Sequence, residues 1–526
     1  MRRRMPWGGV GWDRLLVLSL PVGALACGGG KSDTNPMHTG NPDSSDDSDT
    51  DGDTSTDIVE VFGCDDNANP SSVLADNCVL EAPCSWSGSQ TYEYFGWRVV
   101  SGDDVDGDGR DDMVVAALTW DDEEMDVGRV SLISGAALDE DDDGVVGRFS
   151  GSDYTEYVGY DVAIVGDVNG DGLADTLVGA RGNDDAYENA GEASLLLGAV
   201  GGWGVKDTIA DASFLGESEY GRAGTQVEGL GDVDGDGLAD MGVTGEYKVL
   251  DDDSETYREG RVSVILGRDS GWVLDGSLAD ADAMLNGSDD DGAAGTGLTG
   301  ADFDGDGLSD IAVGAPYDAS TKGRVFVLPG NLATGSVDLS DSAPVQLDGE
   351  SSYDAFGWSI TAGDLTGDGV ADLVVGAPLD DSGWNGAGIV RIYEGNAAFF
   401  DGTPEASSSM VGEFDDQQLG TGLNAHGDVN GDGINDLLSG AIQSYSGILT
   451  KSGKVYLTLG GANGLPASAA DADGRFFGAQ VKNYLGNTAA MGDLNGDGFD
   501  DLMLGAGYSD QDDSKDVGAL YLFWGE

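Results

Sequence analysis

Seven copies of one nine-residue pattern carry the chemistry that can be recognised in this sequence. Each copy places oxygen-bearing side chains at positions 1, 3, 5 and 9, with glycines at positions 4 and 6. The copies read DVDGDGRDD from Asp104, DVNGDGLAD from Asp167, DVDGDGLAD from Asp232, DFDGDGLSD from Asp302, DLTGDGVAD from Asp364, DVNGDGIND from Asp428 and DLNGDGFDD from Asp493. Oxygens at alternate positions can wrap a hard cation, because Ca²⁺ takes roughly six to eight oxygen ligands. The glycines permit the sharp turn that such a loop needs.

We therefore predict a calcium site in each loop, up to seven in all. The expected ligands are the side chains at positions 1, 3, 5 and 9 and the backbone carbonyl at position 7. In chain order these residues are Asp104, Asp106, Asp108, Arg110 and Asp112; Asp167, Asn169, Asp171, Leu173 and Asp175; Asp232, Asp234, Asp236, Leu238 and Asp240; Asp302, Asp304, Asp306, Leu308 and Asp310; Asp364, Thr366, Asp368, Val370 and Asp372; Asp428, Asn430, Asp432, Ile434 and Asp436; and Asp493, Asn495, Asp497, Phe499 and Asp501. A solvated Asp-Gly turn would explain one copy but not seven in register.

The negative charge of the chain exceeds what these loops explain. The chain has 98 acidic and 24 basic residues, which gives a net charge of −74, and the ligand positions account for 24 of the aspartates. Seven divalent ions would offset only 14 of the 74 excess negative charges. The remainder indicates a strongly hydrated surface and argues against nucleic acid as a partner.

The N-terminal region is predicted to direct export. Residues 1–27 combine a basic start, an apolar core and a small-residue cleavage site that ends at Cys27. This ending resembles a lipoprotein box, so we expect a lipid anchor at Cys27 on the outer membrane or cell surface, with plain secretion as the alternative. Residues 28–57 are expected to form a disordered acidic linker, and residues 58–83 a lead-in segment. Export favours a disulfide among Cys64, Cys78 and Cys84, and the sequence leaves the pairing open.

The spacing of the seven loops indicates a repeat architecture. Successive loops begin 63, 65, 70, 62, 64 and 65 residues apart. Short apolar runs rich in β-branched residues lie before and after each loop, for example residues 356–360 and 373–377 in the fifth repeat. A third and a fourth run follow, and runs of this length predict buried strands. Four antiparallel strands repeated seven times predict an all-β, seven-bladed β-propeller over residues 84–526.

The two ends of this region suggest how the ring closes. The last repeat ends after its third strand, at residues 519–524, and an unassigned segment at residues 84–88 resembles the fourth strands of other repeats. We expect the N-terminal strand to complete the last blade, which would remove the open edges of the array.

The repeats resemble the FG-GAP repeats of the integrin α-subunit propeller. The fifth repeat shows the defining elements in order: Phe356-Gly357, the loop from Asp364, and Gly376-Ala377-Pro378. Other repeats lose some of these letters, such as Leu419-Gly420 in the sixth. The resemblance implies a propeller that binds calcium between its first two strands, but it does not identify a ligand, because function is carried by sites rather than by a fold.

Aromatic residues indicate where a partner would bind. The loops between second and third strands, and the links between blades, should lie on the face away from the calcium loops. They carry Trp120, Tyr187, Tyr257, Tyr317, Trp384, Tyr445 and Tyr508 in the loops and Tyr94, Tyr157, Tyr220 and Tyr353 in the links. We expect a monomeric surface protein that binds or adheres to an extracellular protein or glycan. The alternatives are an enzyme acting on an extracellular polysaccharide, a lyase or hydrolase, and a structural spacer; His426 is interpreted as a strand residue rather than a catalytic base.

Overall fold

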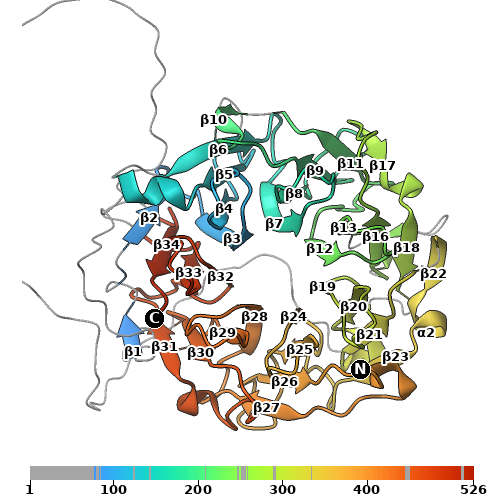
Figure 1. Cartoon of the computed structure of the whole chain (residues 1–526), viewed down its shortest axis with the longest axis vertical. Helices are drawn as coiled ribbons and strands as arrows, with labels where there is room; N and C mark the ends of the chain where they lie inside the picture. The colour runs from blue at the N-terminus through green and yellow to red at the C-terminus, as the bar shows by residue number, and fades with distance from the viewer. Residues whose placement is uncertain are drawn as a thin grey trace, which may run out of the picture.

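The computed structural model describes residues 76–78, 82 and 84–526, apart from residues 122–124, 141–143, 208, 246–247, 250–255, 258, 288–291, 333, 445–450 and 511–514. Within these residues the chain forms seven blades arranged around a central axis (Figure 1). The predicted all-β, seven-bladed propeller is thereby confirmed. The expected signal segment and acidic linker lie outside the described residues.

Each blade contains four antiparallel strands that follow one another from the axis to the rim. The innermost strands are β3 (Phe95–Asp103), β7 (Val158–Gly166), β12 (Val227–Gly231), β19 (Gly297–Ala301), β24 (Ser359–Gly363), β28 (Leu419–Gly427) and β32 (Thr488–Gly492). The second strands are β4 (Asp112–Ala117), β8 (Asp175–Ala180), β13 (Asp240–Gly245), β20 (Asp310–Ala315), β25 (Asp372–Ala377), β29 (Asp436–Ala441) and β33 (Asp501–Ala506). The third strands are β5 (Arg129–Ile133), β9 (Glu192–Leu196), β16 (Arg261–Ile265), β21 (Arg324–Leu328), β26 (Ile389–Tyr393), β30 (Lys454–Thr458) and β34 (Ala519–Phe523). The outer strands are β6 (Val145–Ser150), β11 (Ala212–Leu215), β18 (Ala283–Asn286), β23 (Val345–Asp348), β27 (Ser408–Val411), β31 (Gly474–Phe477) and β2 (Cys84–Ser87).

Four blades gain a fifth strand that the sequence pattern does not predict. The added strands pair in parallel with the rim and are β10 (Gly204–Asp207) on β6, β17 (Gly276–Ser277) on β11, β22 (Gly335–Asp338) on β18 and β1 (Asp76–Cys78) on β31. Three of them come from the segment between the third and outer strands of the following blade. These long segments therefore link neighbouring blades at their edges.

The remaining elements are short. They are the hairpin β14 (Lys248–Val249) and β15 (Thr256–Tyr257), the helices α1 (Asp318–Thr321) and α2 (Leu339–Ser342), and the 3₁₀ turns η2 (Ala136–Glu140), η3 (Leu278–Asp280), η4 (Phe399–Asp401) and η5 (Ala469–Asp471). Within the described part of the chain, no helix has the length and apolar character that a membrane crossing would require.

The N-terminal strand closes the ring, as predicted. Strand β2 pairs antiparallel with β34, with Cys84 opposite Leu522 and Ser87 opposite Ala519. Trp86 is 1% exposed and belongs to the core of the closing blade, with Leu520 and Met503. Cys84 is disulfide-bonded, and the side chain of its partner lies outside the described residues. The closing strand thus joins the beginning of the propeller to its end by both pairing and packing.

A close backbone approach joins each blade to the next. In the fourth blade, Gly323 lies before β21 with a φ of +87°, and a Cβ there would lie 2.2 Å from the carbonyl oxygen of Phe356 in the fifth blade. The same approach closes the ring, because a Cβ at Gly518 would lie 2.0 Å from the carbonyl oxygen of Phe95. Only glycine has both the conformational freedom and the small size for this position. The phenylalanines themselves are buried, so the FG element packs one blade on another.

Candidate functional site

All seven nine-residue loops connect the innermost strand of a blade to its second strand. In the first blade, β3 ends at Asp103 and β4 begins at Asp112, so the loop from Asp104 occupies this turn. Because strands alternate in direction, the seven turns lie on one face of the propeller, which we call the loop face. The turns between second and third strands lie on the other, which we call the opposite face.

The aspartate at position 1 folds each loop around its own carboxylate. In the first loop, Asp104 Oδ1 accepts hydrogen bonds from the amides of Gly107 at 2.6 Å and Asp108 at 3.2 Å, and Oδ2 accepts one from Gly109 at 2.9 Å. The two glycines have φ values of +77° and +92°. This left-handed backbone turns successive amides towards one anion, which explains why glycine occupies positions 4 and 6.

The aspartate at position 9 anchors the loop to the strands beneath it. Asp112 has 0% exposure, and its Oδ2 accepts from the amides of Val105 and Asp106, both at 2.9 Å. Its Oδ1 accepts from Gly135, 3.1 Å away at the end of the third strand. Burial raises the pKa of Asp112 to about 7 and that of Asp501, in the seventh loop, to about 8. A cation nearby would favour the ionised form of these carboxyls.

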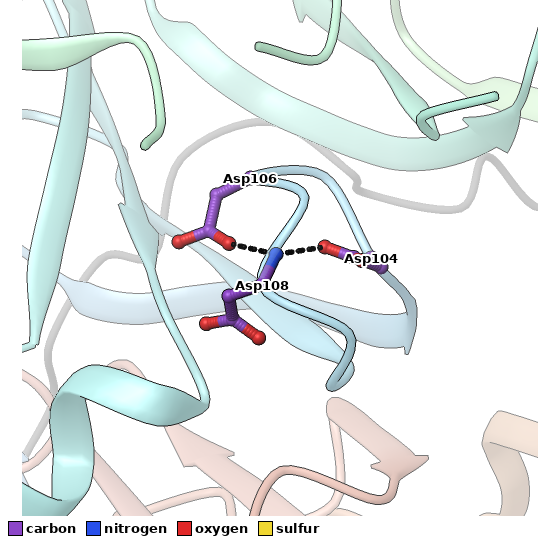
Figure 2. Close-up of side chains that lie close together, drawn as sticks. All are labelled: Asp104, Asp106 and Asp108. Atoms are coloured by element: carbon purple, nitrogen blue, oxygen red, sulfur yellow. Dashed lines mark hydrogen bonds between the residues drawn. The ribbon is translucent and has the colours of Figure 1, made fainter. Parts of the chain in front are cut away.

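Carboxylates from different positions of a loop converge. In the first loop, oxygens of Asp104, Asp106 and Asp108 lie within 4.8 Å of one another (Figure 2). In the third loop, carboxylate oxygens of Asp232, Asp234 and Asp240 also lie within 4.8 Å of one another. The same is true of Asp302, Asp304 and Asp306 in the fourth loop. These three loops have aspartate at position 3, whereas the other four have Asn169, Thr366, Asn430 or Asn495 there. The third position therefore sets how much negative charge each loop concentrates.

Side chains at position 7 pack on the preceding loop. A Cβ at Gly367 would lie 2.8 Å from Ile434 Cδ1, and one at Gly431 would lie 2.7 Å from Phe499 Cε1. The backbone amide of the residue at position 7 donates a hydrogen bond to the carboxylate at position 5 of the same loop, for example from Val370 N to Asp368 Oδ1 at 3.0 Å. The residues at position 7 that do so are Arg110, Leu173, Leu238, Leu308, Val370, Ile434 and Phe499. Their side chains thus join neighbouring loops, and only their backbone can face an ion.

Backbone hydrogen bonds connect the seven loops into a closed ring. The amide at position 8 of each loop donates to the carbonyl oxygen at position 1 of the loop before it. The pairs are Ala174 to Asp104, Ala239 to Asp167, Ser309 to Asp232, Ala371 to Asp302, Asn435 to Asp364, Asp500 to Asp428 and Asp111 to Asp493. Every loop is therefore hydrogen-bonded both to the loop before it and to the loop after it.

The donor set of the loops fits a hard divalent cation. The side chains at the ligand positions offer oxygen only, from aspartate, asparagine or threonine. Oxygen-only sites with several carboxylates suit Ca²⁺ or Mg²⁺, whereas zinc and copper sites use nitrogen or sulfur.

The opposite face exposes part of the predicted set of aromatic residues. Five side chains are more than a third exposed, namely Tyr187, Tyr220, Tyr317, Tyr353 and Trp384, and Trp384 reaches 58%. The half-buried Tyr94, Tyr157 and Tyr508 contribute less. The side chains of Tyr257 and Tyr445 lie outside the described residues.

The prediction for Trp120 is wrong. Its side chain is only 5% exposed, and the Arg129 guanidinium carbon lies 3.2 Å from the centre of its ring. The ring packs beneath its own loop, where a cation–π contact with Arg129 holds it. Trp120 is therefore a structural residue of the first blade.

A second set of polar residues, in the links between blades, was not predicted. Each repeat has a glycine at the place that Gly357 occupies in the FG element. Where the residue three places before this glycine is polar, its side chain is buried, as in Glu93, Glu156, Asp354, Gln417 and Asn483. Glu93 Oε2 accepts from the amides of Ser89 and Gln90, and burial raises its pKa to about 7. In the first, second, fifth and sixth blades this side chain accepts an amide hydrogen bond from the turn that enters the blade, whereas the side chain of Asn483 has no hydrogen-bond partner among the described residues. The recurrence of polar residues three places before this glycine was the sequence signal that could have identified them.

Comparison with known proteins supports the assignment of the repeats. The model of the FG-GAP repeat matches residues 95–133, 294–328, 356–393 and 485–523, which lie in the first, fourth, fifth and seventh blades. Integrin alpha-PS2 of Drosophila melanogaster is 30% identical over 235 residues, which are 42% of this chain and 16% of that protein. Integrin alpha-5 of Xenopus laevis is 29% identical over 225 residues, 41% of this chain and 20% of that protein.

A relative outside the integrins shares the same repeats. Phosphatidylinositol-glycan-specific phospholipase D of Bos taurus is 36% identical over 198 residues, which are 35% of this chain and 22% of that protein. The chain thus aligns with less than a quarter of each of these relatives. Four segments of this chain thus match the FG-GAP repeat within a seven-bladed β-propeller, and parts of the chain are similar to integrin α subunits.

Proposed function

We propose that this protein is a calcium-stabilised binding or adhesion module at the cell surface. The observation that carries the proposal is the ring of seven loops, each with oxygen donors at alternate positions and each hydrogen-bonded to its neighbours. Bound calcium would neutralise the converging carboxylates. The oxygens at positions 1, 3, 5 and 9 and the carbonyl at position 7 would hold the ion in each loop.

The expected contribution of calcium to stability is large. Extracellular calcium modules bind with dissociation constants of about 10⁻⁴ to 10⁻³ M. At ten times that concentration each site would add roughly 1.4 kcal/mol, and seven sites on the order of 10 kcal/mol. A typical domain has a total stability of about 5–15 kcal/mol. The folded propeller would therefore depend on calcium.

The partner would bind on the opposite face, where the exposed aromatic side chains lie. Aromatic rings offer large contact area and lose little side-chain entropy on binding. The net charge of −74 disfavours nucleic acids and other polyanions, and leaves a protein or a glycan as the partner. Export and a lipid anchor at Cys27 would place the propeller at the outer membrane or cell surface, with the linker as a tether.

Titration calorimetry with calcium tests this function. We expect up to seven sites in the chelator-treated protein, and weaker heats with magnesium at the same concentration. As a matched pair, Asp368→Ala should remove one site, whereas Trp384→Ala on the opposite face should remove none. Absence of calcium binding at millimolar concentration would contradict the proposal.

A further inference from the structure

A small pocket lies between the first and second blades. Its volume is about 250 Å³, just below the range of about 300–1,000 Å³ that is usual for drug-sized ligands. Side chains of both blades line it, among them Phe149 of the outer strand β6, Glu192 at the start of β9 and Ser213 of the outer strand β11. A pocket of this size can hold one side chain or one small molecule.

Three carboxylates converge on a single amide group in this pocket. Asn183 Nδ2 lies 2.8 Å from Glu192 Oε2, 3.3 Å from Glu156 Oε1 and 3.4 Å from Asp185 Oδ2. An amide nitrogen carries two hydrogens, so it cannot satisfy three acceptors at once. The described residues that line the pocket include no arginine or lysine, and none of these three carboxylates is in an ion pair with a described residue. Asp275 adds a fourth carboxylate to the lining.

Burial makes this concentration of charge costly. Glu156 is 7% exposed, and burial raises the pKa of both Glu156 and Glu192, to which the neighbouring charge of Asp185 adds. A cation close to the carboxyl groups would stabilise their ionised form. The pocket therefore lacks a positive charge that its own described lining does not supply.

Other blades carry a cation of their own at the corresponding place. The first residue of the third strand, opposite the last residue of the second strand, is basic in four blades, as Arg129, Arg261, Arg324 and Lys454. In the fifth blade the basic residue is Arg391, two residues further along its strand and on the same side. Three of these cations pair with a glutamate of the link that enters their blade: Arg261 with Glu217 at 2.8 Å, Arg391 with Glu350 at 2.8 Å and Lys454 with Glu413 at 3.2 Å.

The second blade reverses the charge at this position. Glu192 stands there, opposite Ala180, while the link into the blade contributes Glu156. The seventh blade has the neutral Ala519 at the same position, but its link at residues 479–484 contains no carboxylate that would need a partner. Within the described chain, the second blade is thus the one whose link and third strand both present carboxylates and no cation.

Two exposed apolar residues border the pocket. Ile209 is 78% exposed and Leu274 is 51% exposed, and both belong to its lining. The aliphatic stem of a lysine or an arginine packs on apolar surface while its charged end reaches polar partners. The pocket offers both kinds of surface, with apolar side chains outside and carboxylates within.

We propose that this pocket binds the side chain of an arginine or a lysine from a partner protein, with its charge on Glu156, Asp185 and Glu192 and its stem on Ile209 and Leu274. The cation would take the place that Arg261 or Lys454 occupies in its own blade. The net charge of −74 would also favour the approach of a basic partner surface. This inference rests on the proposed binding function and assigns a protein rather than a glycan as the partner.

The test follows the isoleucine methyl resonances of the calcium-loaded full chain, because the Ile209 methyl group reports binding at the pocket itself. Ile209→Val identifies its resonance. The probes are the peptide acetyl-Gly-Ser-Arg-Ser-Gly-amide and the same peptide with lysine or with citrulline, an uncharged isostere of arginine, at the central position. We expect the arginine and lysine peptides to shift the Ile209 resonance, and the citrulline peptide to bind at least about tenfold more weakly because it lacks the charge.

Two substitutions of Glu192 test the charge reversal. Glu192→Gln removes one carboxylate and should weaken binding of the arginine peptide about fivefold or more. Glu192→Arg introduces the cation that other blades carry, and should abolish binding and raise the melting temperature in calcium. Glu217→Gln is the matched control, because it removes a glutamate from the third blade, where Arg261 already supplies the cation, and should leave binding within about twofold. A calcium-dependent melt shows that each variant is folded.

The inference is overturned if the citrulline peptide binds as tightly as the arginine peptide, if the Ile209 resonance does not respond, or if Glu217→Gln weakens binding as much as Glu192→Gln does. The side chain of Lys206, in β10, lies outside the described residues, and binding that occurs only in Lys206→Ala would show that the chain fills the pocket itself. Tighter binding of agmatine than of the peptides would show that the site takes a free amine instead. In each of these cases calcium binding by the loops would still stand.

Discussion

The backbone amide of Asp111 donates a hydrogen bond to the carbonyl oxygen of Asp493, 3.3 Å away, and so joins the first loop to the seventh. The contact is reciprocal, because the amide of Asp493 donates to Asp111 Oδ2 at 2.9 Å. Reciprocal pairs also join Asp364 to Asn435 and Asp428 to Asp500. Alanine at position 8, as in Ala174, can make only the backbone half of this contact.

We predict that Asp111→Ala weakens the closure of the ring. The change removes the side-chain half of the contact and leaves the Asp493 amide without that partner, which should cost about 1–2 kcal/mol of unfolding free energy. Chemical denaturation in calcium measures this cost, with Asp280→Ala as a control that removes an exposed charge at η3. Equal effects of the two variants would show that the reciprocal contact does not contribute.

Closure by the N-terminal strand predicts a larger effect at Trp86. Its buried ring fills the core of the seventh blade, so Trp86→Ala should destabilise the protein by about 3–5 kcal/mol. Hydrogen exchange should then rise first in β34, the strand that pairs with β2. Trp384→Ala removes an equally large but exposed ring and should change neither quantity. Uniform loosening of all blades would contradict the assignment.

The raised pKa of Glu93 predicts how stability depends on pH. Its folded pKa of about 7 exceeds the ordinary 4.5, so the stability from the protonated carboxyl is complete below pH 4.5 and is lost as the pH rises through 7. The difference corresponds to on the order of 3 kcal/mol. Glu93→Gln should remove this part of the pH dependence and stabilise the protein at pH 8. The sixth blade already uses Gln417 at this place, with its Oε1 accepting the amide of Glu413.

The measurement is urea denaturation of both proteins between pH 5 and pH 8 in excess calcium. Parallel pH profiles for Glu93→Gln and the unaltered protein would show that the Glu93 carboxyl is already ionised at pH 5 in the folded state.

The residue at position 3 predicts unequal calcium affinities among the loops. Thr366 gives the fifth loop one carboxylate fewer than the first, third and fourth loops have. We therefore expect Thr366→Asp to raise the affinity of the fifth site and Asp304→Asn to lower that of the fourth, each by several-fold, because affinity follows the charge of the ligands. Calorimetric titration of these two variants compares a gain with a loss. No change in either would exclude position 3 as a ligand.

Repetition made most of this fold predictable from the sequence. The period, the four apolar runs of each repeat and the unassigned strand at residues 84–88 were enough for a closed seven-bladed propeller. The parallel rim strands β10, β17 and β22 were not predicted because they are short and form only by pairing with a strand of the neighbouring blade. Trp120 was misplaced because loop position does not show whether a ring turns outward or packs beneath its loop.

The loops themselves were predictable only in part. Spacing indicated which side chains could face an ion, but not that the carboxyl of Asp112 is also a structural anchor with three backbone amides bound to it. The ring of hydrogen bonds between loops depends on the distance between blades, which no local pattern encodes.

The most direct test of the account is the melting temperature of the protein with and without calcium. Seven sites at millimolar calcium should contribute on the order of 10 kcal/mol, so excess EDTA should lower the melting temperature by about 10 °C for a propeller of this size, and added calcium should restore it. Magnesium should restore it less. An unchanged melt in excess EDTA would contradict the claim that the seven loops hold the propeller together through bound calcium.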